Sequence, residues 1–125
     1  MIAEIVPRIL IVDDHAEMAE VIADDLAGRG YRVLALNSGR EALEQLRMQR
    51  FDVLITDMRM PEIDGVALLR ASTQLDPSRP VILMTAYTTL ETAVQATGYG
   101  AYHYLAKPFR LDLLSRLIRQ ALELR

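Results

Sequence analysis

The chain has 125 residues, carries a formal net charge of -3 and is 51% hydrophobic, which is the profile of one globular domain with a single core. It has no cysteine, so disulfides and thiolate metal sites are excluded, and its acidic balance argues against direct contact with nucleic acid. Its apolar runs are too short to cross a bilayer, so we expect one cytoplasmic domain over residues 1–125, with a core from 8 to 124 and no membrane contact.

Five short apolar runs alternate with five segments of helical character. In chain order, the expected strands cover residues 8–12, 31–36, a central run 53–55 that leads to Asp57, 81–84 and 102–106. The expected helices cover residues 16–29, 38 to just before 51, 64–74, 88–97 and 111 to the C-terminus. The fourth helix has few bulky apolar residues, so we expect it to be lightly anchored and the most movable element.

The first three helices carry start signals and apolar stripes. Ser38 and Asp64 are expected N-caps, because each places a side-chain oxygen directly before a helical segment. In the first helix, Met18, Ile22, Asp25-Leu26 and Arg29 roughly follow the spacing of one helical face. The corresponding faces of the second and third helices are expected to consist of Ala42, Leu43 and Leu46, and of Ala67, Leu68 and Ser72 or Leu69.

A strand followed by a helix, repeated five times, predicts a doubly wound parallel α/β sheet, because crossovers between parallel strands are right-handed. With five strands we expect the flavodoxin-like order 2-1-3-4-5, in which strands 1 and 3 are neighbours where the order reverses. Ligands of such sheets bind outside the carboxyl ends of the strands near this point. The residues expected to meet there are Asp13, Asp14, Asp57, Thr85 and Lys107.

This set of residues suits a divalent metal and an anion. Three neighbouring carboxylates cannot all stay ionised near neutral pH without a cation between them, and ligands that are all oxygen favour Mg²⁺. A magnesium ion, a lysine and a hydroxyl around one carboxylate form a phosphoryl site, so Asp57 is the candidate nucleophile and an aspartyl phosphate is the expected product. From its own stretch alone, Asp57 is equally compatible with a turn residue or a helix N-cap.

Four motifs, in this order and each at a strand end, resemble those of response-regulator receiver domains, and the resemblance covers residues 8 to 124. They are Asp13-Asp14 after the first strand, TDMRMPEIDG around Asp57, MTA ending at Ala86, and YLAKPF from Tyr104 to Phe109. The resemblance implies that Asp57 accepts a phosphoryl group from a histidine kinase. The domain would then be a signalling phosphoacceptor that catalyses only its own phosphoryl transfer and dephosphorylation.

The resemblance also implies a role for each residue of the site. The implied Mg²⁺ ligands are Asp13, Asp14, Asp57 and the main-chain carbonyl of Arg59. Among them, Asp13 is expected to act mainly through water. Thr85 and Lys107 are expected to hold phosphoryl oxygens, and Tyr104 is the implied switch aromatic.

Two stretches resemble one particular class of receiver domains. TAYTTLETAVQA and GAYHYLAKPF are similar to receivers attached to ATP-driven activators of the alternative sigma factor. The implied role is transcription regulation through an output domain, either in a longer chain or with a stand-alone receiver. The fourth helix, fifth strand and fifth helix form the implied switch face, where a homodimer or an output-domain contact is expected. The Lys107-Pro108 bond is expected to be cis, because the chain must turn sharply while Lys107 points into the site.

Three other functions fit the same fold. A magnesium-dependent aspartyl phosphatase needs a second acid two residues after its nucleophile, and Arg59 occupies that position. A flavin or nucleotide carrier needs a phosphate-binding loop after the first strand, but DDHAEM is acidic and lacks glycine. A receiver that has lost phosphorylation would not be expected to keep the complete set of acids and lysine.

The remaining polar and sulfur-containing residues have simpler interpretations. We expect His15 to be a loop residue and His103 an exposed strand residue, because the two do not have metal-ligand spacing. Met58, Met60 and Met84 are interpreted as packing residues. Four arginines are interpreted as a solvated helix face or as contacts to a partner, namely Arg110, Arg116, Arg119 and Arg125.

Overall fold

The computed structural model describes residues 6–86, 98 and 100–124. The helix expected over 88–97 lies outside the described residues. The strands are β1 (Arg8–Val12), β2 (Arg32–Leu36), β3 (Val53–Asp57), β4 (Val81–Thr85) and β5 (His103–Ala106). The described helices are α1 (Ala16–Gly28), α2 (Gly39–Met48), α3 (Gly65–Leu75) and α5 (Leu111–Glu123).

The five strands form one parallel sheet in the order β2-β1-β3-β4-β5, which confirms the predicted topology. The pairing is parallel throughout, from Leu10 opposite Leu34 and Leu54 to Met84 opposite Leu105. In this order β1 and β3 are adjacent at the centre of the sheet. The residues that follow them are therefore brought together at one edge.

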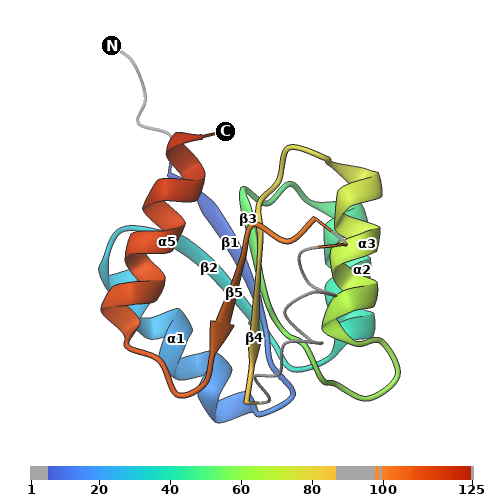
Figure 1. Ribbon diagram of the computed structural model, residues 1–125, viewed down its shortest axis with the longest axis horizontal. Coiled ribbons are helices and arrows are strands. Elements are labelled where there is room, and N and C mark those ends of the chain that lie inside the picture. Colours follow the sequence, from blue (N-terminus) through green and yellow to red (C-terminus); the bar gives the residue numbers. More distant parts are fainter. Residues whose placement is uncertain (1–5, 87–97, 99, 125) are drawn as a thin grey trace.

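Helices cover both faces of the sheet, with α1 and α5 on one side and α2 and α3 on the other (Figure 1). Each side has its own apolar cluster. Ile9 and Ile11 of β1 belong to the cluster beneath α1 and α5, whereas Leu10 and Val12 belong to the cluster beneath α2 and α3. Successive side chains of a strand point to opposite faces, so one apolar run contributes to both cores.

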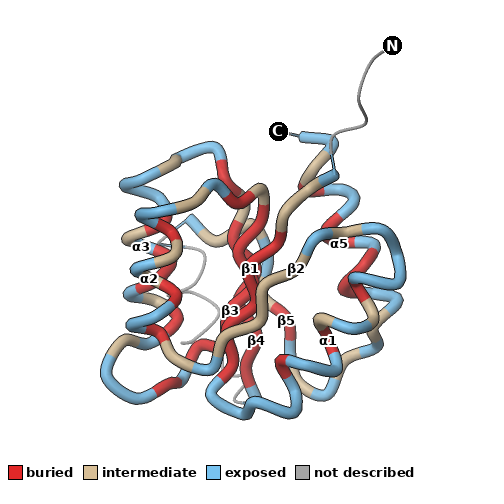
Figure 2. Tube along the Cα trace, turned by 180° about the vertical axis from the view of Figure 1, so that it is seen from behind, coloured by how far each residue is buried: buried red, intermediate tan, exposed pale blue. Residues whose placement is uncertain are grey.

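Burial decreases from the centre of the sheet to its edges (Figure 2). Every residue of β3 and β4 is buried, and only Arg8 of β1 is partly exposed. The edge strands β2 and β5 are mostly half-buried or exposed. The short central strands are therefore a rigid base for the residues that follow them.

Two of the helices begin with the predicted side-chain caps. The side chain of Ser38 accepts a hydrogen bond from the peptide N–H of Glu41, and that of Asp64 accepts one from Ala67. Such caps satisfy an amide that the first turn leaves unpaired. The cap at Asp64 also fixes where the loop after β3 turns into α3.

Two predictions about helix faces were wrong. Met18 is 40% exposed, and the sheet-facing residues of α1 are instead Ala19, Ile22 and Leu26. These three share one helical face, whereas Met18 is rotated by about 100° from Ala19 toward the carboxyl edge of the sheet. In α3, Ala67 is exposed because it lies on the side of the helix opposite the buried residues, which are Gly65, Leu68, Leu69 and Ser72.

Several smaller predictions are confirmed. Met58, Met60 and Met84 are buried packing residues, and His103 is an exposed residue of β5. The Lys107-Pro108 peptide bond is cis. Three arginines of the last segment are exposed, namely Arg110, Arg116 and Arg119, while Arg125 lies outside the described residues. Within the described part of the chain, no helix is long and apolar enough to cross a membrane.

Candidate functional site

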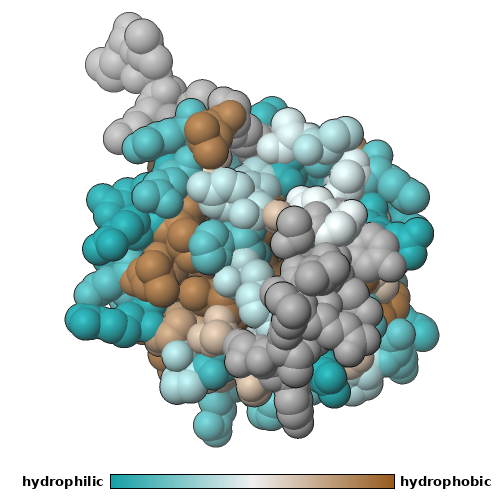
Figure 3. All heavy atoms as spheres, in the orientation of Figure 1, coloured by the Kyte–Doolittle hydropathy of each residue, from teal (hydrophilic) through white to brown (hydrophobic). Residues whose placement is uncertain are grey.

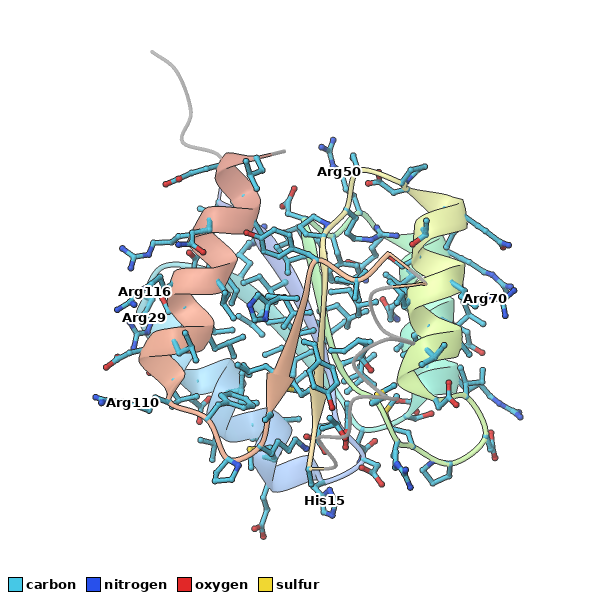
Figure 4. All side chains as sticks on the ribbon, viewed as in Figure 1. His15, Arg29, Arg50, Arg70, Arg110 and Arg116 are labelled. Carbon is cyan, nitrogen blue, oxygen red and sulfur yellow. The ribbon has the colours of Figure 1, made fainter. Side chains whose placement is uncertain are left out.

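The candidate site lies at the carboxyl edge of the sheet. Asp57 is the last residue of β3, Thr85 the last of β4, and Lys107 follows β5 directly. Asp13 and Asp14 follow β1, and the labelled His15 marks this edge in Figure 4, while Arg50 lies at the opposite edge. The predicted convergence of five residues from four strands is therefore confirmed as a spatial arrangement.

Asp57 is a buried carboxylate, with only 6% of its surface exposed. Burial raises the pKa of Asp57, Lys107 opposes this shift by its positive charge, and the nearby Asp13 adds to it. One carboxylate oxygen of Asp57 accepts a long hydrogen bond, 3.4 Å, from the peptide N–H of Arg59. Ionised Asp57 is therefore under-compensated, which is the condition in which an added cation is most strongly favoured.

Lys107 links two acids across the edge. Its Nζ donates to Asp13 Oδ2 at 2.6 Å and to Asp57 Oδ2 at 3.4 Å. Burial by itself would lower the pKa of Lys107, but the hydrogen bond and charge of Asp13, supported by Asp57, raise it overall. Lys107 is thus a fixed cation inside the acidic cluster.

His15 is a loop residue, as expected, and it also lies at this acidic cluster. It is the N-cap of α1, and its Nδ1 lies 3.4 Å from Asp13 Oδ1 and 3.3 Å from Asp14 Oδ1. One ligand atom from each of Asp13, Asp14, His15 and Asp57 lies within 4.8 Å of every other. This group has the donor number and the compactness to hold a metal ion.

A cavity of about 590 Å³ opens over these residues. Its polar lining includes Asp14, Asp57, Thr85 and Lys107, together with His15, Glu17 and Arg59. Met18 and Val21 of α1, which are both substantially exposed, form part of its apolar side. The acidic cluster, Thr85 and Lys107 are therefore accessible to a ligand that enters the cavity from solvent.

The two expected switch residues lie on neighbouring strands but at different depths. Thr85 is 1% exposed, lines the cavity, and its carbonyl accepts a hydrogen bond of 2.7 Å from the peptide N–H of Lys107. Tyr104 is half-buried in β5 and packs against the apolar cluster beneath α2 and α3. The structure places Thr85 at the site and Tyr104 outside the residues that line the cavity.

Gly65 is a site residue whose importance was not predicted from the sequence. A Cβ atom at this position would lie 2.2 Å from the carbonyl oxygen of Asp57 and 2.8 Å from the Cα atom of Met58. Its peptide N–H donates to the carbonyl of Met58 at 3.0 Å. Gly65 therefore lets α3 begin directly against the end of β3 and helps to fix Asp57.

Comparison with known proteins decides the family. A family model described as the response regulator receiver domain matches residues 9–119. The chain is a response regulator receiver domain. The transcriptional regulatory protein ZraR of Escherichia coli K12 is 46% identical to this receiver domain over 114 residues, which are 91% of this chain and 26% of ZraR. The resemblance to receivers of transcriptional regulators is thereby confirmed.

Solved structures agree with this family. A CheY-like receiver domain from Methanospirillum hungatei JF-1 has a TM-score of 0.91 at 29% identity and covers 95% of each chain. A response regulator from Burkholderia pseudomallei, solved with a phosphorylated aspartic acid and a calcium ion, has a TM-score of 0.83 at 31% identity over 94% of this chain and 70% of that chain. This receiver domain spans about a quarter of the length of the curated relatives that it matches.

Proposed function

We propose that this receiver domain accepts a phosphoryl group on Asp57 from a histidine kinase, with Mg²⁺ bound beside it, and thereby switches an output or dimer interface. The observation that carries the proposal is the position of buried Asp57, which lines an open cavity and lies close to a lysine ammonium group and two further carboxylates. A receiver domain is a signalling domain, so the reaction is the modification of the protein itself.

The chemical step uses Asp57 as the nucleophile. One of its carboxylate oxygens forms a bond to phosphorus while the bond between phosphorus and the donor's imidazole nitrogen breaks, and the bonding pair leaves with that nitrogen. Lys107, which lies 3.4 Å from Asp57, is close enough to meet a phosphoryl oxygen after a small side-chain movement. Thr85 supplies a hydroxyl at the end of β4 for a second oxygen.

The acidic cluster fits a divalent cation. Asp13, Asp14 and Asp57 bring three negative charges, and Lys107 brings one positive charge, so the net charge of -2 matches a divalent ion. We propose Asp14, Asp57 and the main-chain carbonyl of Arg59 as direct ligands, with Asp13 acting mainly through water. When bound, Mg²⁺ would neutralise the charge that develops on the transferring phosphoryl group. The calcium ion in the Burkholderia pseudomallei structure supports a cation in this family.

The switch is proposed to pass from Thr85 to the face formed by β5 and α5. Thr85 moves toward the phosphoryl group, and Tyr104 turns inward behind it. Apolar surface lies over α5 and β5 on the face seen in Figure 3. In α5, Leu113 is an exposed large hydrophobic residue. This face is the proposed contact for a homodimer or for an output domain.

The proposed partners of this domain are inferred from its family and from the relatives that it matches. The proposed donor is a histidine kinase or a phosphotransfer protein. The proposed output is transcription, through an ATP-driven activator of the alternative sigma factor or another DNA-binding regulator, because a named relative is a transcriptional regulatory protein that is about four times longer than the matched segment. The proposed location is the cytoplasm, where such kinases and regulators meet.

The test is incubation with acetyl phosphate, read by intact mass. With Mg²⁺, the wild-type protein should gain the mass of one phosphoryl group, and with a chelator it should gain none. Asp57→Asn should stay unlabelled in both conditions, because an amide is a poor nucleophile. A phosphatase on the same fold would instead release phosphate over many turnovers without lasting labelling. Labelling of Asp57→Asn at the wild-type rate would overturn the proposal.

A further inference from the structure

His15 has a position at the acidic cluster that the phosphoacceptor function does not require. Its Nδ1 faces Asp13 Oδ1 at 3.4 Å and Asp14 Oδ1 at 3.3 Å, although the side chain is 76% exposed. No described residue other than His15 adds a nitrogen ligand to this carboxylate cluster. The other histidine of the chain, His103, lies on β5 with its ring Nδ1 3.0 Å from the carbonyl oxygen of Tyr104.

The backbone of His15 is held in place from both sides. Its peptide N–H donates to Asp13 Oδ1 at 2.9 Å, and its carbonyl accepts hydrogen bonds from Met18 and Ala19 in the first turn of α1. Only the side-chain dihedral angles remain free to adjust. An imidazole on such a fixed backbone needs little ordering to bind a shared ion, so less entropy is lost on binding.

The donor set determines which ions this arrangement favours. Mg²⁺ prefers oxygen ligands and water, whereas imidazole nitrogen together with carboxylates suits first-row transition ions such as Mn²⁺, Co²⁺ and Zn²⁺. The three carboxylates and Lys107 together carry a net charge of -2, which balances a divalent cation, and neutral imidazole adds a ligand without changing that charge.

We infer that His15 is a ligand of the divalent-metal site and makes this site prefer a first-row transition ion over Mg²⁺. The inference rests on the proposed function, because it uses the same site, and it deepens that function by naming the class of metal. The ion would be shared by the His15 Nδ1 and carboxylate oxygens of Asp14 and Asp57, which lie within 4.8 Å of one another.

The competing explanation is an ion pair between protonated His15 and the two acids, with no role in metal binding. Calorimetric titration separates the two. Zn²⁺ and Mg²⁺ are titrated separately at pH 8 into wild type, His15→Ala, Asp57→Asn and the matched control His103→Ala. We expect His15→Ala to lose at least about tenfold more affinity for Zn²⁺ than for Mg²⁺, on the scale of a lost metal-site interaction. His103→Ala should match the wild type for both ions.

Nuclear magnetic resonance distinguishes metal binding from an ion pair, because only metal binding makes the ring signal of His15 respond directly to added Zn²⁺. The chain has two histidines, so the ring Cε1–H region contains two signals, which His103→Ala assigns. Zn²⁺ should shift or broaden the His15 signal at the same concentrations that saturate the calorimetric site, and Asp57→Asn should weaken this effect. Equal losses for Zn²⁺ and Mg²⁺ in His15→Ala, or Zn²⁺ binding that Asp57→Asn leaves unchanged, would overturn the inference.

The two proposals can fail separately. If Mg²⁺ supports labelling of Asp57 by acetyl phosphate but His15→Ala keeps the wild-type preference for Zn²⁺, only the metal inference is wrong. If Asp57 is not labelled and Asp57→Asn leaves Mg²⁺ affinity unchanged, the proposed function is wrong, whatever the result for Zn²⁺.

Discussion

Lys107 donates a hydrogen bond of 2.6 Å to Asp13, which is shorter than the 3.4 Å that separates its Nζ from Asp57. Asp13 is completely buried and the Lys107 side chain is 14% exposed, so this ion pair is largely shielded from water. Lys107 is also the only lysine in the sequence. In the described state, the lysine therefore compensates the charge of Asp13 first and that of Asp57 second.

Replacing Lys107 with Ala should destabilise the metal-free protein by about 3 kcal/mol, because it leaves a buried carboxylate without its cation. Mg²⁺ should raise the melting temperature of Lys107→Ala more than that of the wild type, since the ion replaces the missing positive charge. Thermal unfolding with and without Mg²⁺ measures both effects. Arg40→Ala is the control, because Arg40 pairs with Glu62 at the surface. A loss equal to that of the control would contradict the importance of the buried pair.

Asp57→Asn should stabilise the metal-free protein near neutral pH, by on the order of 1 kcal/mol. The sign follows from the raised pKa of Asp57, which is caused first by burial. The folded protein binds this proton more tightly than the unfolded chain does, so ionisation of Asp57 costs stability as pH rises above 3.8 through the raised value. The advantage of Asp57→Asn should therefore grow from pH 4 to 7 and shrink when Mg²⁺ is added. A constant difference between the two proteins would refute this explanation.

Gly65→Ala should destabilise the protein by roughly 2 kcal/mol, because the new methyl group meets the backbone of Asp57 and Met58 and neither strand nor helix can move away freely. Gly28→Ala is the matched control. A Cβ atom at Gly28 meets nothing within 4 Å, and this exposed residue ends α1, so alanine there should be neutral or stabilising by up to about 1 kcal/mol. Chemical unfolding of both variants provides the comparison. Equal stabilities would show that the contact at Gly65 can relax.

The ion pair between Arg29 and Asp112 should contribute to the pH dependence of stability. The two side chains join α1 to α5 at 2.9 Å, and the hydrogen bond from Arg29 lowers the pKa of Asp112 below 3.8. A lowered folded-state pKa means stability that is present above pH 3.8 and is lost as pH falls through the lower value. Unfolding of wild type and Asp112→Asn should therefore differ most at neutral pH and low salt, and converge in acid. Because both groups are at the surface, salt should reduce the difference.

The fold could be predicted from the sequence because buried parallel strands appear as short continuous apolar runs. Each such run, for example Val81–Thr85, was recognisable without its partners, and the repeated alternation with helices limited the topology to a few choices. Helix faces were less predictable. Methionine is an apolar residue type that is common in protein cores. Only the angular position of Met18 relative to Ala19 decides that it faces the edge of the sheet instead.

The site was predictable where residue type and position at a strand end agree, as for Asp57 and Lys107. It was not predictable where a contact depends on the exact path of the backbone. The role of Gly65 comes from a close approach to Asp57 that no spacing rule reveals. The place of His15 at the site was not predicted, because a histidine was expected to bind a metal only beside a second histidine at ligand spacing, whereas its neighbours at the site are carboxylates.

The proposal that Asp57 is the phosphoacceptor is tested most directly by determining which residue carries the phosphoryl group. The protein is treated with acetyl phosphate and Mg²⁺, reduced with borohydride, which converts an aspartyl phosphate to homoserine, and sequenced by tandem mass spectrometry. We predict homoserine at position 57 only, with none when Mg²⁺ is chelated. Homoserine at position 13 or 14, a phosphoryl group on His15, or no modification under any metal condition would contradict the assignment of Asp57 as the phosphoacceptor.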